Sequence, residues 1–230
     1  AFEQHVATCR KKRGLEVSPG WYEQPVFYFS NPLGLIGTDV AVHAPTGSEE
    51  LDYELELGLI IGTPGRDIRA ADAWQHVAGF TIVNDFSARD LQRREMSVGL
   101  GPAKGKDFAT AIGPVMVSLD EVEDCIDPQG RLHLEMVARV NGKELSRGNA
   151  ASMYFTWPQI IEHGSRDAML VPGDLLGSGT VGTGCILELG PENTGGWLKP
   201  GDVVELEIER IGVLRTPIAA RPAPRETQMR

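Results

Sequence analysis

The sequence predicts a single domain of the α+β class that is predominantly β. Apolar runs of strand length recur along the chain, and glycine and proline separate them, with 27 Gly and 15 Pro in 230 residues. A chain of this length with 41% hydrophobic residues can bury a substantial core. Neither an internal repeat nor a linker divides the sequence, so one domain is the simplest interpretation.

The N-terminal half combines strand-type runs with short helical patterns. Residues 2–13 favour a helix that ends at Gly14, and residues 70–77 have a helical pattern. The sequence Ser87-Ala88-Arg89-Asp90 has the form of a capping box and predicts a helix that continues to about Glu95. Runs rich in aliphatic and aromatic residues predict strands at 25–29, 54–61, 79–83 and 113–117.

The C-terminal half is expected to return to strands after one further helix at 155–163. Residues 132–140 alternate in polarity towards Asn141-Gly142, a dipeptide typical of a tight hairpin turn. Further strands are predicted at 174–176, 185–189 and 203–213. We therefore expect the folded domain to cover residues 1–217 and a flexible tail to cover residues 218–230.

Charge and cysteine content exclude several classes of function. The formal net charge of -10 argues against binding to nucleic acid or to anionic membrane surfaces. Cys9, Cys125 and Cys185 are widely spaced and form no C-x-x-C motif, which predicts free thiols in a reducing compartment. No apolar run is long enough to span a bilayer, and the N-terminus lacks a signal-like apolar core. We expect a cytoplasmic protein.

Carboxylates at the ends of two apolar runs predict a metal site. Glu54 and Glu56 are two residues apart, so their side chains share one face of a strand that continues with apolar residues on both faces. Asp85 follows the next apolar run, at 79–83. Carboxylates that enter a core are costly unless a cation compensates their charge. Three carboxylates without clustered Cys or His favour Mg²⁺, Mn²⁺ or Ca²⁺ over zinc.

Each of these residues also has a plainer interpretation. Glu54 and Glu56 could face solvent on a half-exposed strand, as we expect for the glutamates that alternate with Leu and Ile in 203–213. Asp85 could accept hydrogen bonds from nearby backbone amides in a turn.

The sequence of residues 177–182 matches G-x-G-x-x-G, the fingerprint of dinucleotide-binding loops. The residues that follow, 183–189, are of β-type, so the helix N-terminus that binds a pyrophosphate is not expected there. We interpret the segment as a tight loop whose backbone and Thr180 approach a small ligand, or as a simple turn between strands.

Several of these segments together resemble one known family. The chain is similar to the fumarylacetoacetate hydrolase family over nearly its whole length, and most similar to fumarylacetoacetase-like bacterial members. The resemblance is carried, in this order along the chain, by Glu54-Leu55-Glu56, Asn84 to Gln92, Gly105 to Phe108 and Pro172 to Thr180. It implies the family's mixed β-sandwich roll, assembled as a homodimer.

The resemblance also implies roles for individual residues. The metal ligands are Glu54, Glu56 and Asp85, and the residues beside the ion are Lys106 and Thr110. The catalytic groups are His5, Glu188 and Lys106. Glu188 orients His5, and Lys106 together with Gln92 stabilises a developing oxyanion. The residues in contact with substrate are Tyr28, Arg89, Gln92 and Thr180, of which Arg89 also braces the network.

The activity implied is metal-dependent hydrolysis of a carbon–carbon bond in a small β-diketo acid such as fumarylacetoacetate, in aromatic amino-acid and tyrosine breakdown. In this reaction His5 takes a proton from water, and a divalent metal ion binds the diketone. Mg²⁺ is the expected ion, and Mn²⁺ or Ca²⁺ are alternatives. The same residues also suit acylpyruvate or fumarylpyruvate hydrolysis, oxaloacetate-type decarboxylation, or muconate-type isomerisation and decarboxylation. A protein that binds a metal or small ligand without catalysis is a further alternative.

The chain departs from the family pattern at two places. The family carries an aspartate seven residues before the catalytic histidine, a position that would precede Ala1, so we expect part of the N-terminal catalytic motif to be missing. Met96 stands where fumarylacetoacetase has a substrate-binding tyrosine, and the region from Arg93 to Lys104 is one residue longer than the pattern. The far end of the substrate is therefore expected to differ.

Overall fold

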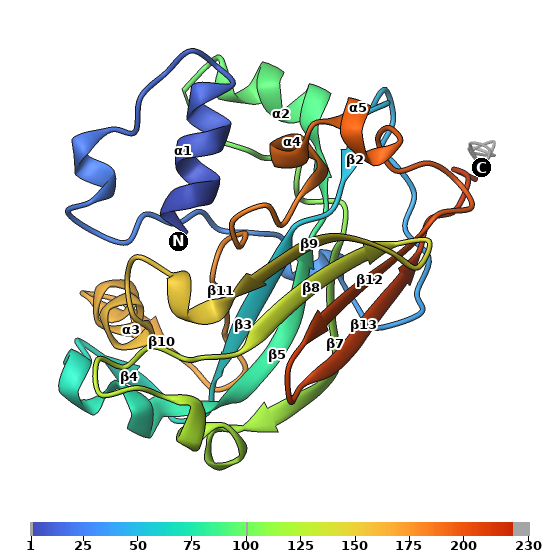
Figure 1. Cartoon of the computed structure of the whole chain (residues 1–230). Helices are drawn as coiled ribbons and strands as arrows, with labels where there is room; N and C mark the ends of the chain where they lie inside the picture. Colours follow the sequence, from blue (N-terminus) through green and yellow to red (C-terminus); the bar gives the residue numbers. More distant parts are fainter. Residues whose placement is uncertain (1, 100, 223–230) are drawn as a thin grey trace, which may run out of the picture.

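Two curled β-sheets pack against each other in the computed structural model, which describes residues 2–99 and 101–222 (Figure 1). The larger sheet contains, in spatial order, β1 (Leu35–Ile36), β7 (Thr110–Ser118), β5 (Val77–Asp85), β3 (Leu55–Ile61) and β11 (Leu175–Gly177). The smaller sheet contains β13 (Gly212–Pro217), β12 (Val203–Ile208), β8 (Glu135–Val140) and β9 (Lys143–Asn149). Strand β1 pairs with β7 in parallel, and the other neighbours pair antiparallel. The predicted α+β, predominantly β fold is confirmed.

Shorter elements surround the two sheets. Two small ribbons pair β2 (Leu51–Asp52) with β6 (Ser87–Ala88) and β4 (Gly65–Arg66) with β10 (Met169–Leu170). The α-helices are α1 (Glu3–Lys11), α2 (Arg89–Met96), α3 (Trp157–Ser165), α4 (Ile186–Leu189) and α5 (Pro191–Thr194). Helix α1 lies against α4, although about 180 residues separate them in the chain (Figure 1).

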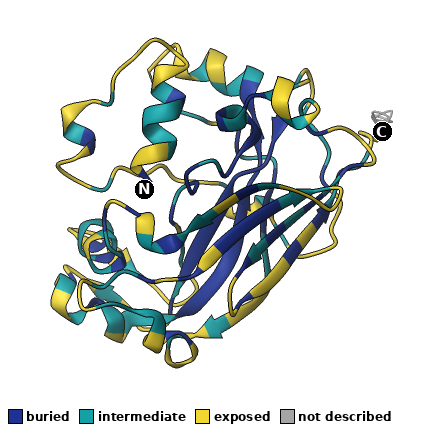
Figure 2. Cartoon of the chain, in the orientation of Figure 1, coloured by how far each residue is buried: buried dark blue, intermediate teal, exposed yellow. Residues whose placement is uncertain are grey.

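The core lies between the two sheets and is centred on β3. Leu55, Leu57 and Leu59 are fully buried on one face of β3, and they join one cluster with Phe80 and Ile82 of β5. Figure 2 shows β3 and β5 as the most continuously buried strands. Because the other face of β3 is also covered, any charge placed on that face is withdrawn from water.

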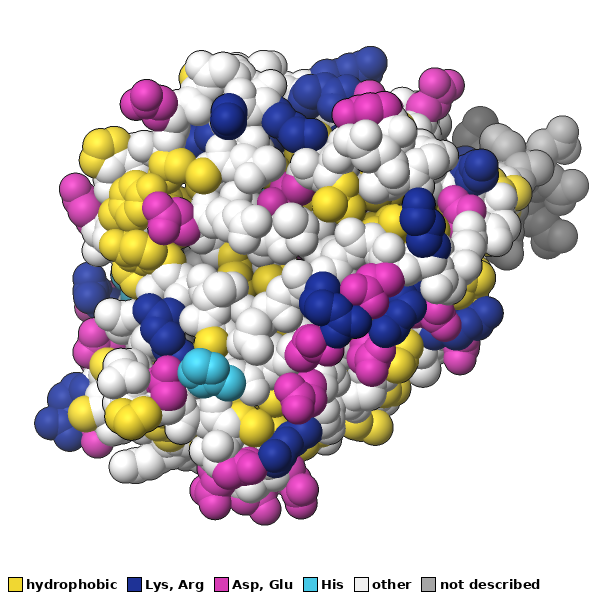
Figure 3. Space-filling view, in the orientation of Figure 1, with side chains coloured by type: hydrophobic (Ala, Val, Ile, Leu, Met, Phe, Trp, Pro, Cys, Tyr) yellow, Lys and Arg dark blue, Asp and Glu magenta, His cyan; other side chains and the backbone are white. Residues whose placement is uncertain are grey.

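The outer face of the smaller sheet is polar. Arg147 on β9 pairs with Glu144, and Arg139 on β8 pairs with Glu207 on β12. On the face seen in Figure 3, basic and acidic side chains are interspersed over these strands. Alternation of buried and partly exposed residues along β12 agrees with the prediction that its glutamates point outward.

The Asn141-Gly142 hairpin is confirmed. Val140 and Lys143 pair directly, and both turn residues have positive φ, 53° for Asn141 and 74° for Gly142. This backbone matches the twist of the two strands that it joins.

Two predicted strands are wrong, and a third is divided, because residues 203–213 contain β12, a turn at 209–211 and the start of β13. Residues 25–29 form no strand: they run along the surface, where Phe27 and Phe29 are exposed. Residues 185–189 contain the single helical turn α4 instead, because the Asp52 carboxylate accepts hydrogen bonds from the N–H groups of Ile186 and Leu187 at 2.8 and 3.0 Å. A buried side chain from a distant segment therefore caps this turn, which local propensity does not encode.

The predicted helices are present, with two corrections of detail. Residues 70–76 form a 3₁₀-helix. Helix α2 follows Ala88 with no side-chain cap, and the Ser87 hydroxyl instead donates to the Asp85 carbonyl. The capping box that the structure does contain joins Thr156 and Gln159 at the start of α3.

The predicted tail at 218–230 lies partly outside the described residues, which end at 222. Within its described part, Ile218 is buried, and its N–H donates to the Asp202 carbonyl at 2.8 Å. Ordered packing thus continues past Pro217.

Candidate active site and metal centre

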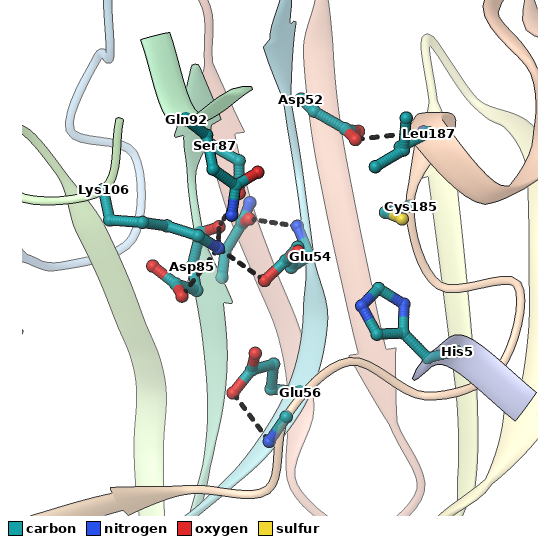
Figure 4. A network of polar contacts seen from close by, with 12 residues as sticks. His5, Asp52, Glu54, Glu56, Asp85, Ser87, Gln92, Lys106, Cys185 and Leu187 are labelled. Carbon is teal, nitrogen blue, oxygen red and sulfur yellow. Dashed lines mark hydrogen bonds and ion pairs between the residues drawn. The ribbon is translucent and has the colours of Figure 1, made fainter. Parts of the chain in front are cut away.

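Three predicted metal ligands converge at one point of the larger sheet. Glu56 lies on β3, Glu54 immediately precedes this strand, and Asp85 ends the neighbouring strand β5. The two segments are held in register by the Asp85 N–H, which donates to the Glu54 carbonyl at 3.3 Å. All three side chains are buried, and one carboxylate oxygen from each lies within 4.8 Å of the others (Figure 4).

Lys106 lies between two of these carboxylates. Its Nζ is 2.7 Å from Glu54 Oε2 and 2.9 Å from Asp85 Oδ2. The loop can bring Lys106 here because Gly105 packs on the backbone of Gln92, where a Cβ would lie 2.9 Å from the Gln92 nitrogen. Burial opposes the charge of Lys106, but Asp85 and Glu54 outweigh it and raise the Lys106 pKa.

Arg89 joins the metal centre to a fourth buried carboxylate, Asp52. Its guanidinium is 2.8 Å from Asp52 Oδ2 and 2.9 Å from Glu54 Oε1, and it donates to Gln92 Oε1 at 3.1 Å. Burial opposes ionisation of Glu54, but the charges of Lys106 and Arg89 hold the pKa of its carboxyl well below the ordinary range. Asp52 was not predicted from the sequence as a site residue, although it shares the two-residue spacing of Glu54 and Glu56.

The buried charges favour a divalent cation. When all are ionised, the four carboxylates described above carry four negative charges and the two basic groups carry two positive charges. Burial, with the charges of Asp85 and Glu54, therefore raises the pKa of Glu56 to about 8. Among the described residues, the buried Asp85 Oδ1 has no hydrogen-bond partner. One divalent ion would balance the two remaining charges and give this oxygen a ligand role, so the residues fit a hard cation.

Glu56 is oriented by the glycine-rich loop at 177–182. Its Oε2 accepts a hydrogen bond from the Gly179 N–H at 3.1 Å. Gly177 leaves room for the carboxylate, because a Cβ at that position would lie 2.6 Å from Oε2. The loop thus positions a metal ligand, and the N-terminus of the following helical turn is occupied by Asp52 rather than free for a phosphate.

His5 and Glu188 form a second group beside the carboxylates. His5 on α1 bonds through Nδ1 to Glu188 Oε1 on α4 at 2.6 Å, and Glu188 Oε2 accepts from the Thr183 N–H at 3.0 Å. Burial alone would lower the pKa of His5, but its contacts with Cys185 and Glu188, together with the negative charge of Glu54, raise it to about 10. The imidazole can therefore hold a proton beside the metal centre (Figure 4).

The remaining predicted site residues are Tyr28, Thr110, Thr180, Arg89 and Gln92. The Tyr28 hydroxyl donates to Asp85, and burial of this hydroxyl together with the negative charge of Asp85 raises the Tyr28 pKa well above the usual value, so it remains a donor. Thr110 pairs with Asp85 across β7 and β5, and Thr180 is buried next to the glycines of the 177–182 loop. Arg89 and Gln92 contact each other, and Arg89 also contacts two carboxylates.

Two cysteines close to His5 were also missed from the sequence. Cys9 lies one helical turn after His5 on α1, with Sγ 3.8 Å from Nε2, and Cys185 Sγ is 3.7 Å from Glu188 Oε1. The i, i+4 spacing of His5 and Cys9 is a signal that the sequence carries. The third cysteine, Cys125, lies elsewhere, and all three are free thiols.

Several known proteins are similar to this chain in sequence and in fold. The model of the fumarylacetoacetate (FAA) hydrolase C-terminal family matches residues 1–219. The human mitochondrial oxaloacetate tautomerase FAHD2A is 36% identical over 194 residues, which are 84% of this chain and 58% of that protein. This chain therefore spans little more than half of the human relative.

Two solved structures are similar as well. The 5-carboxymethyl-2-hydroxymuconate delta-isomerase from Mycobacterium smegmatis has a TM-score of 0.72 and 30% identity, covering 90% of this chain and 72% of that one. The fumarylpyruvate hydrolase from Pseudomonas aeruginosa, solved with Mn²⁺ and pyruvate, has a TM-score of 0.74 and 25% identity, covering 94% and 86%. In the part of the chain that the structure describes, no helix is long and apolar enough to cross a membrane. The chain belongs to the fumarylacetoacetate hydrolase family.

Proposed function

We propose that this chain carries the catalytic site of a metal-dependent enzyme that moves a proton on a small 2-oxo acid, and that keto–enol tautomerisation of an oxaloacetate-like diacid is its reaction. The observation that carries the proposal is the juxtaposition of a proton-holding group, His5 with Glu188, and a carboxylate cluster that fits a divalent cation. A tautomerase needs both: a group that exchanges a proton with carbon, and positive charge that stabilises the enolate.

Glu54, Glu56 and Asp85 would hold the ion, and Mg²⁺ is the ion that we propose, because hard carboxylate oxygens suit it. Mn²⁺ and Ca²⁺ accept the same ligands. When bound, such an ion polarises the 2-oxo group and lowers the energy of the enolate. Lys106 and the Tyr28 hydroxyl, both within reach of Asp85, add positive charge and a hydrogen-bond donor beside it.

His5 would give and take the proton. With its pKa raised to about 10, the imidazole holds a proton at neutral pH and can deliver it to the carbon of an enol. A cation at the carboxylates would offset the effect of Glu54 but leave the bond to Glu188 intact. Glu188 fixes the ring, because its other oxygen is itself held by the Thr183 N–H.

Hydrolysis of a carbon–carbon bond in fumarylpyruvate or a similar diketo acid is the second candidate. The fold similarity to the fumarylpyruvate hydrolase, across 94% of this chain, favours it. That reaction requires His5 to accept a proton from water and so to start neutral, whereas the hydrogen bonds around His5 favour its protonated form. The human relative, a tautomerase, also supports the first candidate.

A panel of oxo acids tests the proposal. Equilibration of enol and keto oxaloacetate is followed by ultraviolet absorbance with Mg²⁺ or Mn²⁺, and ions without protein give the background rate. Fumarylpyruvate and fumarylacetoacetate are assayed in parallel for hydrolysis. We expect tautomerisation above background, lost on chelation. Hydrolysis without tautomerisation would favour the second candidate, and no reaction with any acid would refute both.

Substitution of His5 tests its role. His5→Gln should lower the rate by about 10²–10⁴-fold, the usual contribution of a general acid–base group. His133→Gln is the matched control, because His133 is exposed and pairs with Asp127 away from the site. Equal rates for His5→Gln and the unmodified protein would exclude His5 as the proton carrier.

A further inference from the structure

The two cysteines beside His5 have no part in the proposed reaction, yet both are buried next to it. Cys9 lies on α1 and Cys185 immediately before α4, so two segments that contact each other each present one thiol. Cys9 Sγ is 3.9 Å from His5 Nδ1 and Cys185 Sγ is 3.7 Å from Glu188 Oε1, so the bonded pair of His5 and Glu188 lies between the two thiols. Their surroundings contain a histidine and a carboxylate, the other common ligands of thiophilic ions.

We propose that Cys9, Cys185, His5 and Glu188 form a second metal site, selective for thiophilic divalent cations such as Zn²⁺, beside the carboxylate centre. Ligand atoms of His5, Cys185 and Glu188 lie within 4.8 Å of one another. Cys9 lies outside this group, but its Sγ is 3.9 Å from His5 Nδ1, and as a fourth ligand it would give a set of two sulfurs, one nitrogen and one oxygen, which zinc accepts. Mg²⁺ binds oxygen ligands, so the two sites differ in chemistry as well as position.

Two of the donor distances are close to those of tetrahedral coordination. Metal–ligand bonds of about 2.0–2.3 Å place two ligands of a tetrahedral ion roughly 3.3–3.8 Å apart. Cys9 Sγ is 3.9 Å from His5 Nδ1, and Cys185 Sγ is 3.7 Å from Glu188 Oε1. His5 Nδ1 and Glu188 Oε1 are closer, at 2.6 Å, because a proton joins them. This pair would separate when the ion replaces that proton.

Binding has a direct consequence for catalysis. The two thiols ionise and release their protons to solvent, and the imidazole that coordinates the ion can no longer carry a proton. The His5 side chain is 17% exposed, so an ion can reach the group from that side. Zinc would therefore inhibit the enzyme while Mg²⁺ remains at the carboxylates. This inhibition rests on the proposed function, whereas the binding does not.

Binding of Cd²⁺ alone tests the site without any substrate. The full chain, kept reduced and in excess Mg²⁺, is titrated with Cd²⁺, and the ultraviolet charge-transfer band of cadmium thiolates is recorded. We expect one equivalent to bind with this band. Cys9→Ser and Cys185→Ser should each weaken binding at least about tenfold and reduce the band. Cys125→Ser is the matched control and should bind as the unmodified protein does, because Cys125 lies outside the cluster.

Three outcomes would overturn the proposal: no thiolate band, a band that persists in Cys9→Ser, or a band that only Cys125→Ser removes. Cys185 is fully buried, and if its variant does not fold, Cys9→Ser decides alone. Competition between Zn²⁺ and Cd²⁺ extends the result to zinc. If the oxo acids are inert but cadmium binds as described, the second metal site stands and the proposed function fails.

Discussion

Replacement of Arg89 by methionine should destabilise the protein strongly. The Arg89 guanidinium contacts Asp52 at 2.8 Å and Glu54 at 2.9 Å, and all three side chains are at most 6% exposed. Methionine retains much of the length of the side chain but leaves both carboxylates without this cation. Removal of one partner from a buried ion pair costs about 3–5 kcal/mol. For a domain of this size that lowers Tm by roughly 6–20 °C.

Arg93→Met on the same helix is the control that isolates burial. Arg93 pairs with both oxygens of Glu50 at 2.7 Å, a shorter and bidentate contact, but its side chain is 52% exposed. Exposed ion pairs contribute less than about 1 kcal/mol, so we expect a small loss. Urea and thermal unfolding of both variants, followed by circular dichroism, give the comparison. A loss in Arg93→Met equal to or larger than that in Arg89→Met would refute the reasoning, because contact distance would then outweigh burial.

Two further predictions concern the metal centre. Gly177→Ala should weaken Mg²⁺ binding roughly 10–100-fold, because the new Cβ would displace the Glu56 carboxylate. Gly164→Ala is the control and should leave Mg²⁺ binding unchanged, because its new Cβ would have no atom closer than 3.9 Å. Calorimetric titration of both variants gives the comparison. Mg²⁺ affinity should fall as the pH drops below about 8, because the pKa of Glu56 is raised and a proton then competes with the ion for this carboxylate. Titrations with Mg²⁺ at several pH values check this. An affinity that does not change with pH would contradict it.

Most of the fold could be predicted from the sequence because its strands carry their own signals. The apolar run of β3 and the Asn141-Gly142 turn are local patterns, and the structure agrees with both. The segments that were mispredicted depend on distant partners. Residues 185–189 look like a strand in isolation, but Asp52, more than 130 residues away, fixes their first turn as a helix.

The strand predicted at 25–29 is wrong for a different reason. Its aromatic residues favour a strand, but it pairs with no strand among the described residues, and the segment instead turns one side chain, Tyr28, towards Asp85. Strand propensity identifies residues that favour a strand, but it does not determine which strand would pair with them.

The site could be predicted only in part for a related reason. Strand alternation places Glu54 and Glu56 on one face, but the proximity of His5 to Glu188 depends on the packing of α1 on α4. Without the family resemblance, the sequence indicates a role for neither residue. The i, i+4 spacing of His5 and Cys9 is visible in the sequence, but the proximity of Cys185 was missed because it depends on that packing.

Asp52 connects the two halves of the site. Its carboxylate pairs with Arg89, which also holds Glu54 of the metal centre, and it caps the helical turn that carries Glu188. The position of the metal ligands and the orientation of His5 therefore share one buried residue. A change that loosens Arg89 should disturb proton transfer as well as metal binding, although Arg89 and His5 are not in contact through any hydrogen bond among the described residues. The buried Asp52–Arg89 pair thus couples the two chemical functions of the site, and stability is only one of its effects.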